Sequence, residues 1–228
     1  MKRLISFVLP MMAAISAQVM AVPMLNTLVA GADPLADGGV IGFQLTDTDG
    51  INDDINAFIF LESAGYAGVN QVGIYDWLDP SRMLTVFNGA DAFGTSRTLS
   101  YTAGTFALGI NTLAVVDPIF GVFLTNPEGT FYSNPALNAD GFDHFAVFDT
   151  VGSTGLAGVF DFVVGIEDQF GGGDQDYNDF VFGITDVQPF RAQVPVPATG
   201  LLFAIGAAGL IASKKKKGKG KGKPCLVG

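Results

Sequence analysis

Short apolar stretches, ended by glycine, proline, asparagine or aspartate, run through most of this chain and limit what it can fold into. Residues 40–46 alternate as in a strand, and Asn88-Gly89 is a strong turn signal. No stretch of about ten residues between 22 and 193 keeps a helical period free of glycine. Short strands with turns about every eight to twelve residues predict an all-β fold, an antiparallel β-sandwich or jelly roll. The expected strands are 40–46, 56–62, 71–75, 83–87, 97–101, 105–110, 120–124, 145–148, 159–166 and 180–184.

A densely acidic segment spans residues 165–182 and reads G-I-E-D-Q-F-G-G-G-D-Q-D-Y-N-D-F-V-F. Hard oxygen ligands on a loop bent by glycines are what calcium needs, and carboxylates beside an apolar strand need a cation or hydrogen bonds. The segment therefore predicts a calcium site, and a solvated turn with Asx hydrogen bonds is the alternative. It is not an EF-hand, because the spacing from Asp174 lacks that motif's glycine and final glutamate. The candidate ligands are Glu167, Asp168, Asp174, Asp176, Asn178 and Asp179.

Two other loops carry weaker forms of the same chemistry. Residues 138–144 include the only histidine, His144, and a histidine beside an aspartate indicates an acid–base pair, a metal ligand or a structural hydrogen bond near the acidic segment. We favour the structural role. Residues 47–54 resemble the opening of a calcium loop but lack a closing glutamate, so a solvated loop is equally consistent. The weaker candidate ligands are Asp140, Asp143, Asp47, Asp49 and Asp53.

Signals for catalysis are few. The chain has no G-x-S-x-G, no H-E-x-x-H and no glycine-rich phosphate loop, so we expect no enzyme activity. Paired carboxylates also serve glycosidases, but here they lie in glycine-rich turns, which suit a metal better than a cleft. Tyr75, Trp77 and Tyr132 form either a sugar-stacking face or part of the core, and we favour the core.

The charge and the cysteine content limit which partners and which stabilising bonds we expect for this chain. All 22 acidic residues lie between residues 22 and 193, against Arg82, Arg97 and Arg191, which leaves a net charge of −19 for this part. Such a surface repels nucleic acid and attracts divalent cations, so we expect no nucleic-acid partner. The only cysteine is Cys225, outside this stretch, so no disulfide braces the domain and bound metal is a natural substitute.

The N-terminus has the features of a secretory signal peptide. Lys2 and Arg3 precede an apolar stretch over 4–17, and small residues place the cleavage after Ala21, with Ala17 as the alternative site. A first transmembrane helix is the competing interpretation, which the short stretch and Pro10 disfavour.

The C-terminus carries a second targeting pattern. Val-Pro-Val-Pro-Ala at 194–198 opens an apolar segment over 199–212, and lysines 214–217 follow. This order resembles the PEP-CTERM sorting signal of Gram-negative bacteria that make exopolysaccharide, which implies processing by an exosortase-type membrane protease. We expect the segment to form a single hydrophobic helix, long enough for a marginal membrane span, with the lysines on the cytoplasmic side.

Three stretches together resemble the bacterial domain of unknown function 4114. They read Glu62-Ser-Ala-Gly-Tyr…Val72-Gly-Ile-Tyr-Asp, Phe131-Tyr-Ser-Asn…Leu137-Asn-Ala-Asp-Gly-Phe-Asp-His and Gly165-Ile-Glu-Asp…Gly172-Gly-Asp-Gln-Asp-Tyr-Asn-Asp. The last stretch is the most specific. The resemblance implies a β-sandwich module, associated with calcium, over about residues 70–185, and it supplies no reaction.

These observations give an organisation and a function. We expect a signal peptide (1–21), N-terminal strands with an acidic loop (22–69), a β-sandwich module (70–187), a linker (188–193), a sorting motif with membrane helix and basic cluster (194–217) and a Lys/Gly tail (218–228). The expected function is that of an exported, calcium-stabilised, non-catalytic protein of the bacterial surface or exopolysaccharide matrix. A calcium-dependent carbohydrate-binding module and a metal-dependent glycan hydrolase are the alternatives. Expected partners are the secretion machinery, the sorting protease and extracellular polysaccharide.

Overall fold

The computed structural model describes residues 40–46, 54–62, 65–150 and 157–191, together with Leu25, Val29 and the pair Asp33–Pro34. The expected signal peptide, the sorting motif with its hydrophobic helix and the Lys/Gly tail lie outside these residues. The loop that carries Asp47, Asp49 and Asp53 lies outside them as well. Within the described part, no helix is both long and apolar enough to cross a membrane.

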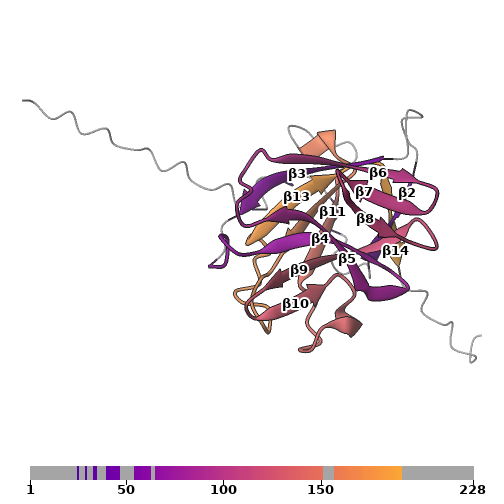
Figure 1. Cartoon of the computed structure of the whole chain (residues 1–228). Coiled ribbons are helices and arrows are strands. Elements are labelled where there is room, and N and C mark those ends of the chain that lie inside the picture. The colour runs from indigo at the N-terminus through magenta and orange to yellow at the C-terminus, as the bar shows by residue number, and fades with distance from the viewer. Residues whose placement is uncertain are drawn as a thin grey trace, which may run out of the picture. The chain divides into compact units, whose positions relative to one another are not determined.

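Two antiparallel sheets pack as a sandwich, as the alternating pattern predicted (Figure 1). Among the described residues, the first sheet has eight strands in the order β1-β11-β12-β13-β3-β6-β7-β8. The second has six, β14-β2-β9-β4-β5, with β10 paired to β9. The strands of the first sheet are β1 (Asp33–Pro34), β11 (Phe145–Asp149), β12 (Phe162–Ile166), β13 (Phe180–Ile184), β3 (Asp54–Glu62), β6 (Ser96–Thr102), β7 (Thr105–Leu108) and β8 (Asn111–Ala114). Those of the second are β14 (Val187–Arg191), β2 (Val40–Leu45), β9 (Ile119–Asn126), β4 (Gln71–Asp76), β5 (Asp79–Asn88) and β10 (Gly129–Tyr132), and the short 3₁₀ helices are η2 (Pro135–Leu137) and η3 (Ala157–Val159).

The structure corrects several expected boundaries. Residues 188–191, expected as linker, belong to β14, which pairs with β2 through backbone hydrogen bonds that composition does not reveal. β14 ends its sheet, and an edge strand tolerates Pro189. The stretch 159–166 is strand only from Phe162, and 105–110 ends at Leu108 because Gly109 turns the chain at φ +61°. β8 and most of β10 were missed, since four-residue strands carry almost no period.

Aromatic rings join the two sheets. Phe43 on β2 is 1% exposed, and its ring centroid lies 6.0 Å from that of Phe120 on β9 and 5.7 Å from that of Phe162 on β12. Phe87 on β5 contacts Phe180 on β13 in the same way, with centroids 6.0 Å apart. Such pairs add about 0.5–1.5 kcal/mol beyond the area they bury, so the core depends on phenylalanine in both layers.

β12 and β13 are buried on both faces, which explains their continuous apolar sequences. All five residues of each strand are buried. One face meets the main core, and the other carries Val163 and Val181 into a second cluster with Phe60, Leu25 and Val29. The connection between these two strands is therefore anchored at both ends in apolar surroundings, and it is the acidic segment.

Replacing Phe43 with alanine should remove the ring that links the sheets. We expect a loss of about 3–5 kcal/mol in the free energy of unfolding, because the substitution leaves a cavity between two packed layers. Denaturant unfolding monitored by circular dichroism measures it. Ile110→Ala is the matched control: Ile110 is 97% exposed in a hairpin turn, and its loss should change the stability by less than about 0.5 kcal/mol. Equal effects of the two substitutions would contradict this account of the core.

Candidate metal centre

The acidic segment connects β12 to β13 and begins with two carboxylates directly after a buried strand. Glu167 and Asp168 are both 0% exposed, whereas Asp174 and Asp176 lie on the exposed part of the loop. Asp179 is buried at the point where β13 begins. Five of the six predicted ligands are thus acidic groups spread from the core to the surface along one loop.

Glu167, Asp174 and Asp176 form a triad of carboxylates. One oxygen from each lies within 4.8 Å of the others. The Oε1 atom of Glu167 accepts a hydrogen bond of 2.6 Å from the Tyr177 N–H, while its buried Oε2 atom has no hydrogen-bond partner. Burial raises the pKa of Glu167, and the charges of Asp174 and Asp176 add to the increase, partly offset by the Tyr177 N–H. An unpaired buried carboxylate oxygen beside two more carboxylates is a place that favours a cation.

The loop backbone takes an unusual course to bring these side chains together. Gly171, Gly172 and Gly173 all have positive φ, and so do the non-glycine residues Gln175 and Tyr177 at +60° and +54°. A side chain at a left-handed position costs about 1 kcal/mol, which the surrounding contacts must offset. Glycine adopts such angles without this cost, so the turn favours glycine at these three positions.

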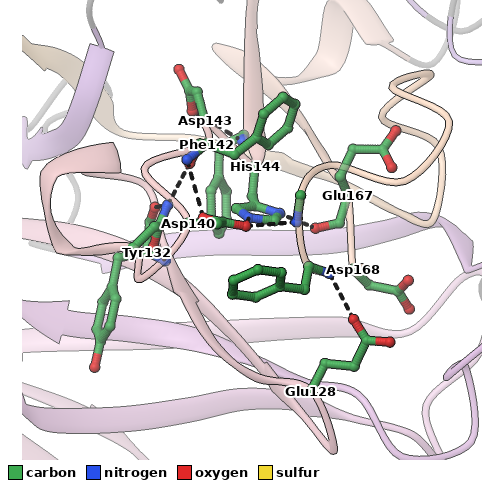
Figure 2. A network of polar contacts seen from close by, with 12 residues as sticks. Glu128, Tyr132, Asp140, Phe142, Asp143, His144, Glu167 and Asp168 are labelled. Atoms are coloured by element: carbon green, nitrogen blue, oxygen red, sulfur yellow. Dashed lines mark hydrogen bonds and ion pairs between the residues drawn. The ribbon is translucent and has the colours of Figure 1, made fainter.

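A second loop holds the start of the acidic segment in place. Figure 2 shows the ring of His144 between Asp140 and the backbone at Glu167. His144 is 0% exposed, its Nδ1 atom lies 3.0 Å from the Glu167 carbonyl oxygen and its Nε2 atom lies 3.0 Å from Asp140 Oδ2. Its ring stacks on Phe131 with centroids 4.0 Å apart. The histidine thus has the structural role that the sequence favoured, next to the acidic segment.

Both ring nitrogens of His144 are engaged in hydrogen bonds. The Glu167 carbonyl oxygen can only accept, so the contact at Nδ1 is a hydrogen bond donated by the ring, and Nε2 contacts the Asp140 carboxyl. Burial acts to raise the pKa of Asp140, but the Gly171 and Phe142 N–H groups and the His144 ring outweigh it and hold that pKa below its usual range. His144 therefore connects Asp140 to the backbone of Glu167 and holds the start of the segment.

Two residues of the β9–β10 hairpin, in the second sheet, form hydrogen bonds with the backbone of the acidic segment. Asn126 Nδ2 donates to the Asp168 carbonyl oxygen at 2.6 Å. Glu128 Oε2 accepts from the Phe170 N–H at 2.6 Å, and Figure 2 shows the Glu128 carboxylate next to the segment. The other oxygen of Glu128 accepts from the Tyr66 hydroxyl. These contacts hold the backbone of the segment without involving the triad.

Asp168 and Asp179 lie apart from the triad. Asp168 Oδ2 accepts from Asn70 Nδ2 at 2.9 Å, and the Asp168 N–H donates to Asp179 Oδ2 at 3.0 Å. Burial, together with the neighbouring Asp168 and Glu167 carboxylates, raises the pKa of Asp179 to about 7. Burial also raises the pKa of Glu62, at the end of β3, to about 7, with contributions from Asp91 and Asp168. The predicted ligand set therefore divides into two groups.

The remaining predicted residues have other contacts. Asn178 donates from its N–H and its side-chain amide to Asp176, so it positions a triad carboxylate. Asp143 accepts from the Phe145 N–H, and its carbonyl accepts from the Tyr177 hydroxyl. Sequence reasoning did not include Glu62, Asn70, Asn126 or Glu128 among the site residues, although each is a polar residue at or beside a strand end.

The suggested aromatic face is not continuous. Tyr75 is 0% exposed and belongs to the core, where its ring packs edge-on against Tyr132 with centroids 5.1 Å apart. Trp77 is half-buried, and its ring meets Phe190 at 4.9 Å. Trp77 and Phe190 line a surface pocket of about 210 Å³ together with Asp117. Tyr75 is thus core, as favoured, and Trp77 lies beside a pocket.

Comparison with known proteins identifies a domain. Residues 109–186 match the domain of unknown function DUF4114. The match includes residues 131–144 and 165–179 but not the stretch from Glu62 to Asp76, so it is shorter than the expected 70–185. No curated protein and no solved structure matches the chain.

Replacing Gly172 with alanine should disrupt the segment. A Cβ atom there would collide with the Phe142 ring, in addition to the strain at φ +83°. We expect a loss of about 2–4 kcal/mol in the free energy of unfolding. Gly171→Ala is the control, because its φ is +79° but a Cβ atom would meet nothing within 4 Å, so it should cost only about 1 kcal/mol. Chemical denaturation of both variants compares them, and equal losses would contradict the steric part of this explanation.

The raised pKa of Glu62 predicts a pH dependence of the metal-free protein. Its folded-state pKa of about 7 exceeds the ordinary 4.5, so between these values the folded state binds more protons than the unfolded one. Stability then falls as pH rises from about 4.5 to 7 and stays low above 7. In a chelator, Glu62→Gln should be more stable than the parent above pH 7, by about 1–2 kcal/mol after solvent screening, and should lose this advantage below pH 5.

Glu128 provides a control of opposite sign for this titration. The Phe170 N–H and the Tyr66 hydroxyl lower the pKa of Glu128, so its contribution to stability is present above about pH 4.5 and is lost as pH falls through its folded-state pKa. Glu128→Gln should therefore be less stable than the parent at pH 7. Urea unfolding from pH 4 to 8 measures both variants. A difference between Glu62→Gln and the parent that does not change with pH would contradict the burial of Glu62.

Proposed function

We propose that this chain is a calcium-stabilised, non-catalytic β-sandwich protein in which Glu167, Asp174 and Asp176 bind the ion. The observation that carries the proposal is the Oε2 atom of Glu167, which is buried, has no partner and lies in a triad with two other carboxylates. A structural role in an acidic loop would leave this oxygen hydrogen-bonded. A cation satisfies it directly.

The donor set fits calcium better than other metals. All three ligands are carboxylates, which are hard oxygen donors and disfavour zinc or copper. Calcium takes six to eight oxygens in flexible geometry, so the triad would supply part of the shell, and loop carbonyls and water the rest. Magnesium demands near-ideal octahedral geometry, which a loop with exposed Asp174 and Asp176 does not enforce.

The role of the ion in this proposal is to stabilise the fold. Between residues 22 and 193 the chain has no cysteine, so no disulfide can hold the acidic segment. An ion that binds Glu167 from the core and Asp174 and Asp176 from the loop would join them, and it would neutralise charge that repels in the free protein. The absence of catalysis is supported by His144, whose two nitrogens are engaged and buried.

The cellular setting in this proposal is the surface or the exopolysaccharide matrix of a Gram-negative bacterium. The support is the sequence at the two ends, which has the order of a signal peptide and of a PEP-CTERM-type sorting signal. The secretion machinery and an exosortase-type protease are the partners that these ends imply. Calcium is available outside the cytosol, which agrees with a stabilising ion.

A calcium-dependent carbohydrate-binding module is the second candidate, and one observation favours it. The pocket beside Trp77 combines two aromatic rings with the carboxylate of Asp117, the pattern that stacks on a sugar and bonds to its hydroxyls. Retention on an acidic-polysaccharide column that is lost on Trp77→Ala would identify this function. Glycan turnover lost on Asp174→Ala in a folded protein would instead identify a hydrolase.

Calcium titration of the chelator-treated full chain by isothermal calorimetry tests the proposed site. Glu167→Gln keeps the shape of the side chain but removes one charge and one ligand oxygen, so binding at the triad should weaken by about tenfold or more. Asp79→Asn is the control: this exposed carboxylate at the start of β5 contacts Ser81 and should leave binding unchanged. Calcium binding that is the same in Glu167→Gln and in the parent would overturn the assignment of the triad.

A further inference from the structure

The second group of polar side chains lies where four chain segments meet. Glu62 ends β3 and pairs with Phe180, the first residue of β13, which Asp179 precedes. Asp168 follows β12, and Asn70 precedes β4 in the other sheet. The Asn70–Asp168 hydrogen bond of 2.9 Å bridges 98 residues of sequence and crosses from one sheet to the other. Backbone pairing thus brings three carboxylates and an amide to the same end of the sandwich.

Three oxygens in this group are buried and have no hydrogen-bond partner. They are Oε1 of Glu62, Oδ1 of Asn70 and Oδ1 of Asp168. Asn70 is 1% exposed and Asp168 is 0% exposed, so water does not reach either side chain freely. A buried oxygen without a hydrogen bond costs about 1–3 kcal/mol in general, and more for a carboxylate, so each of the three calls for a partner.

The charges in this group lack a basic partner in the described part of the chain. Its two arginine ion pairs are Arg82 with Asp76 and Arg97 with Asp91, and neither includes Glu62, Asp168 or Asp179. Glu62 pairs in register with Phe180, next to Asp179, and Asp179 Oδ2 accepts from the Asp168 N–H, so the three acidic residues are neighbours. Either protons or a cation must neutralise them.

We propose that a second calcium ion binds between Glu62, Asn70 and Asp168, at the junction of the two sheets. Asp168 is adjacent to Glu167 in sequence, but its side chain faces Asn70, whereas Glu167 faces Tyr177 and the triad. The two ions would therefore lie on different sides of one short piece of backbone. Rotation of the Asn70 side-chain amide about its Cβ–Cγ bond would place Oδ1 where Nδ2 now contacts Asp168. The site therefore needs only this side-chain flip.

The proposed second calcium site gives a reason for the hydrogen bonds that fix the backbone of Asp168. Asn126 Nδ2 fixes the Asp168 carbonyl, and Asp179 fixes the Asp168 N–H. These bonds orient the Asp168 carboxylate toward the junction without using the three unpaired oxygens. An ion there would join β3 and β12 in the first sheet to β4 in the second, whereas the triad ion joins only the segment to β12. The proposal rests on the calcium-binding function above but on a separate set of atoms.

The number of calcium ions bound per chain tests this proposal. We expect equilibrium dialysis of the full chain with calcium at pH 7.5 to give two ions in the parent protein. Glu62→Gln should weaken one of the two by about tenfold or more, because it removes charge from the ligand set while keeping its shape. Asp174→Asn with Asp176→Asn should remove the other ion and leave the first sensitive to Glu62→Gln. Asp79→Asn should again leave both unchanged.

Asn70→Leu provides a second variant, since it removes the amide oxygen at similar volume, and circular dichroism checks that it folds. Two ions, one lost with Glu62→Gln or Asn70→Leu, would support the proposal. A single ion that depends on the triad and binds equally well to Glu62→Gln and Asn70→Leu would overturn the proposal of a second ion. The triad assignment would then remain, and protons would neutralise the junction. A single ion that depends on Glu62 and Asn70 but not on the triad would support the junction and overturn the triad. No bound ion would overturn both.

Discussion

The carboxylates of Glu167 and Asp168 follow directly on a strand that is buried on both faces, and the rest of this end of the molecule is arranged around them. β12 passes between the main core and a second apolar cluster, so its last side chains leave the sheet where water is scarce. Both carboxylates are fully buried, and one oxygen of each has no partner. Burying charge in this way is costly unless a counter-charge is present.

The surrounding contacts satisfy the backbone of the segment and leave one oxygen of Glu167 and one of Asp168 without a hydrogen bond. His144, Asn126 and Glu128 all bond to main-chain atoms of residues 167–170, and Asp140 bonds to the Gly171 N–H. Such an arrangement pre-organises a binding loop, because the conformational cost is met by contacts that do not compete with the ligand. The glycines at 171–173 then return the chain so that Asp174 and Asp176 reach Glu167. The fold thus positions the site directly, because the β9–β10 hairpin of the second sheet holds the acidic segment that follows β12 in the first sheet.

Much of the fold and part of the site could be predicted because they depend on local sequence. The all-β class follows from short strands and turns, and Glu167, Asp174 and Asp176 lie within one loop, so spacing alone brought them together as candidates. The division of that loop into two groups could not be predicted. It depends on which way Glu167 and Asp168 face and on Glu62 and Asn70, which β-sheet pairing places near Asp168 from distant parts of the chain. The same reason applies to β14, which could not be predicted from its composition because it forms a strand by pairing with β2.

The central claim is that a divalent cation completes the buried acidic end of the sandwich, and thermal unfolding of the full chain tests it most directly. At pH 7.5, the melting temperature should rise steadily as calcium increases from chelated to millimolar concentrations. An ion at about a hundred times its dissociation constant adds roughly 2.7 kcal/mol to the free energy of unfolding, a shift of several degrees for a domain of this size. Magnesium at the same concentration should produce a smaller rise. A melting temperature that is the same in chelator and in calcium would contradict the claim and would mean that shared protons and hydrogen bonds alone neutralise these carboxylates.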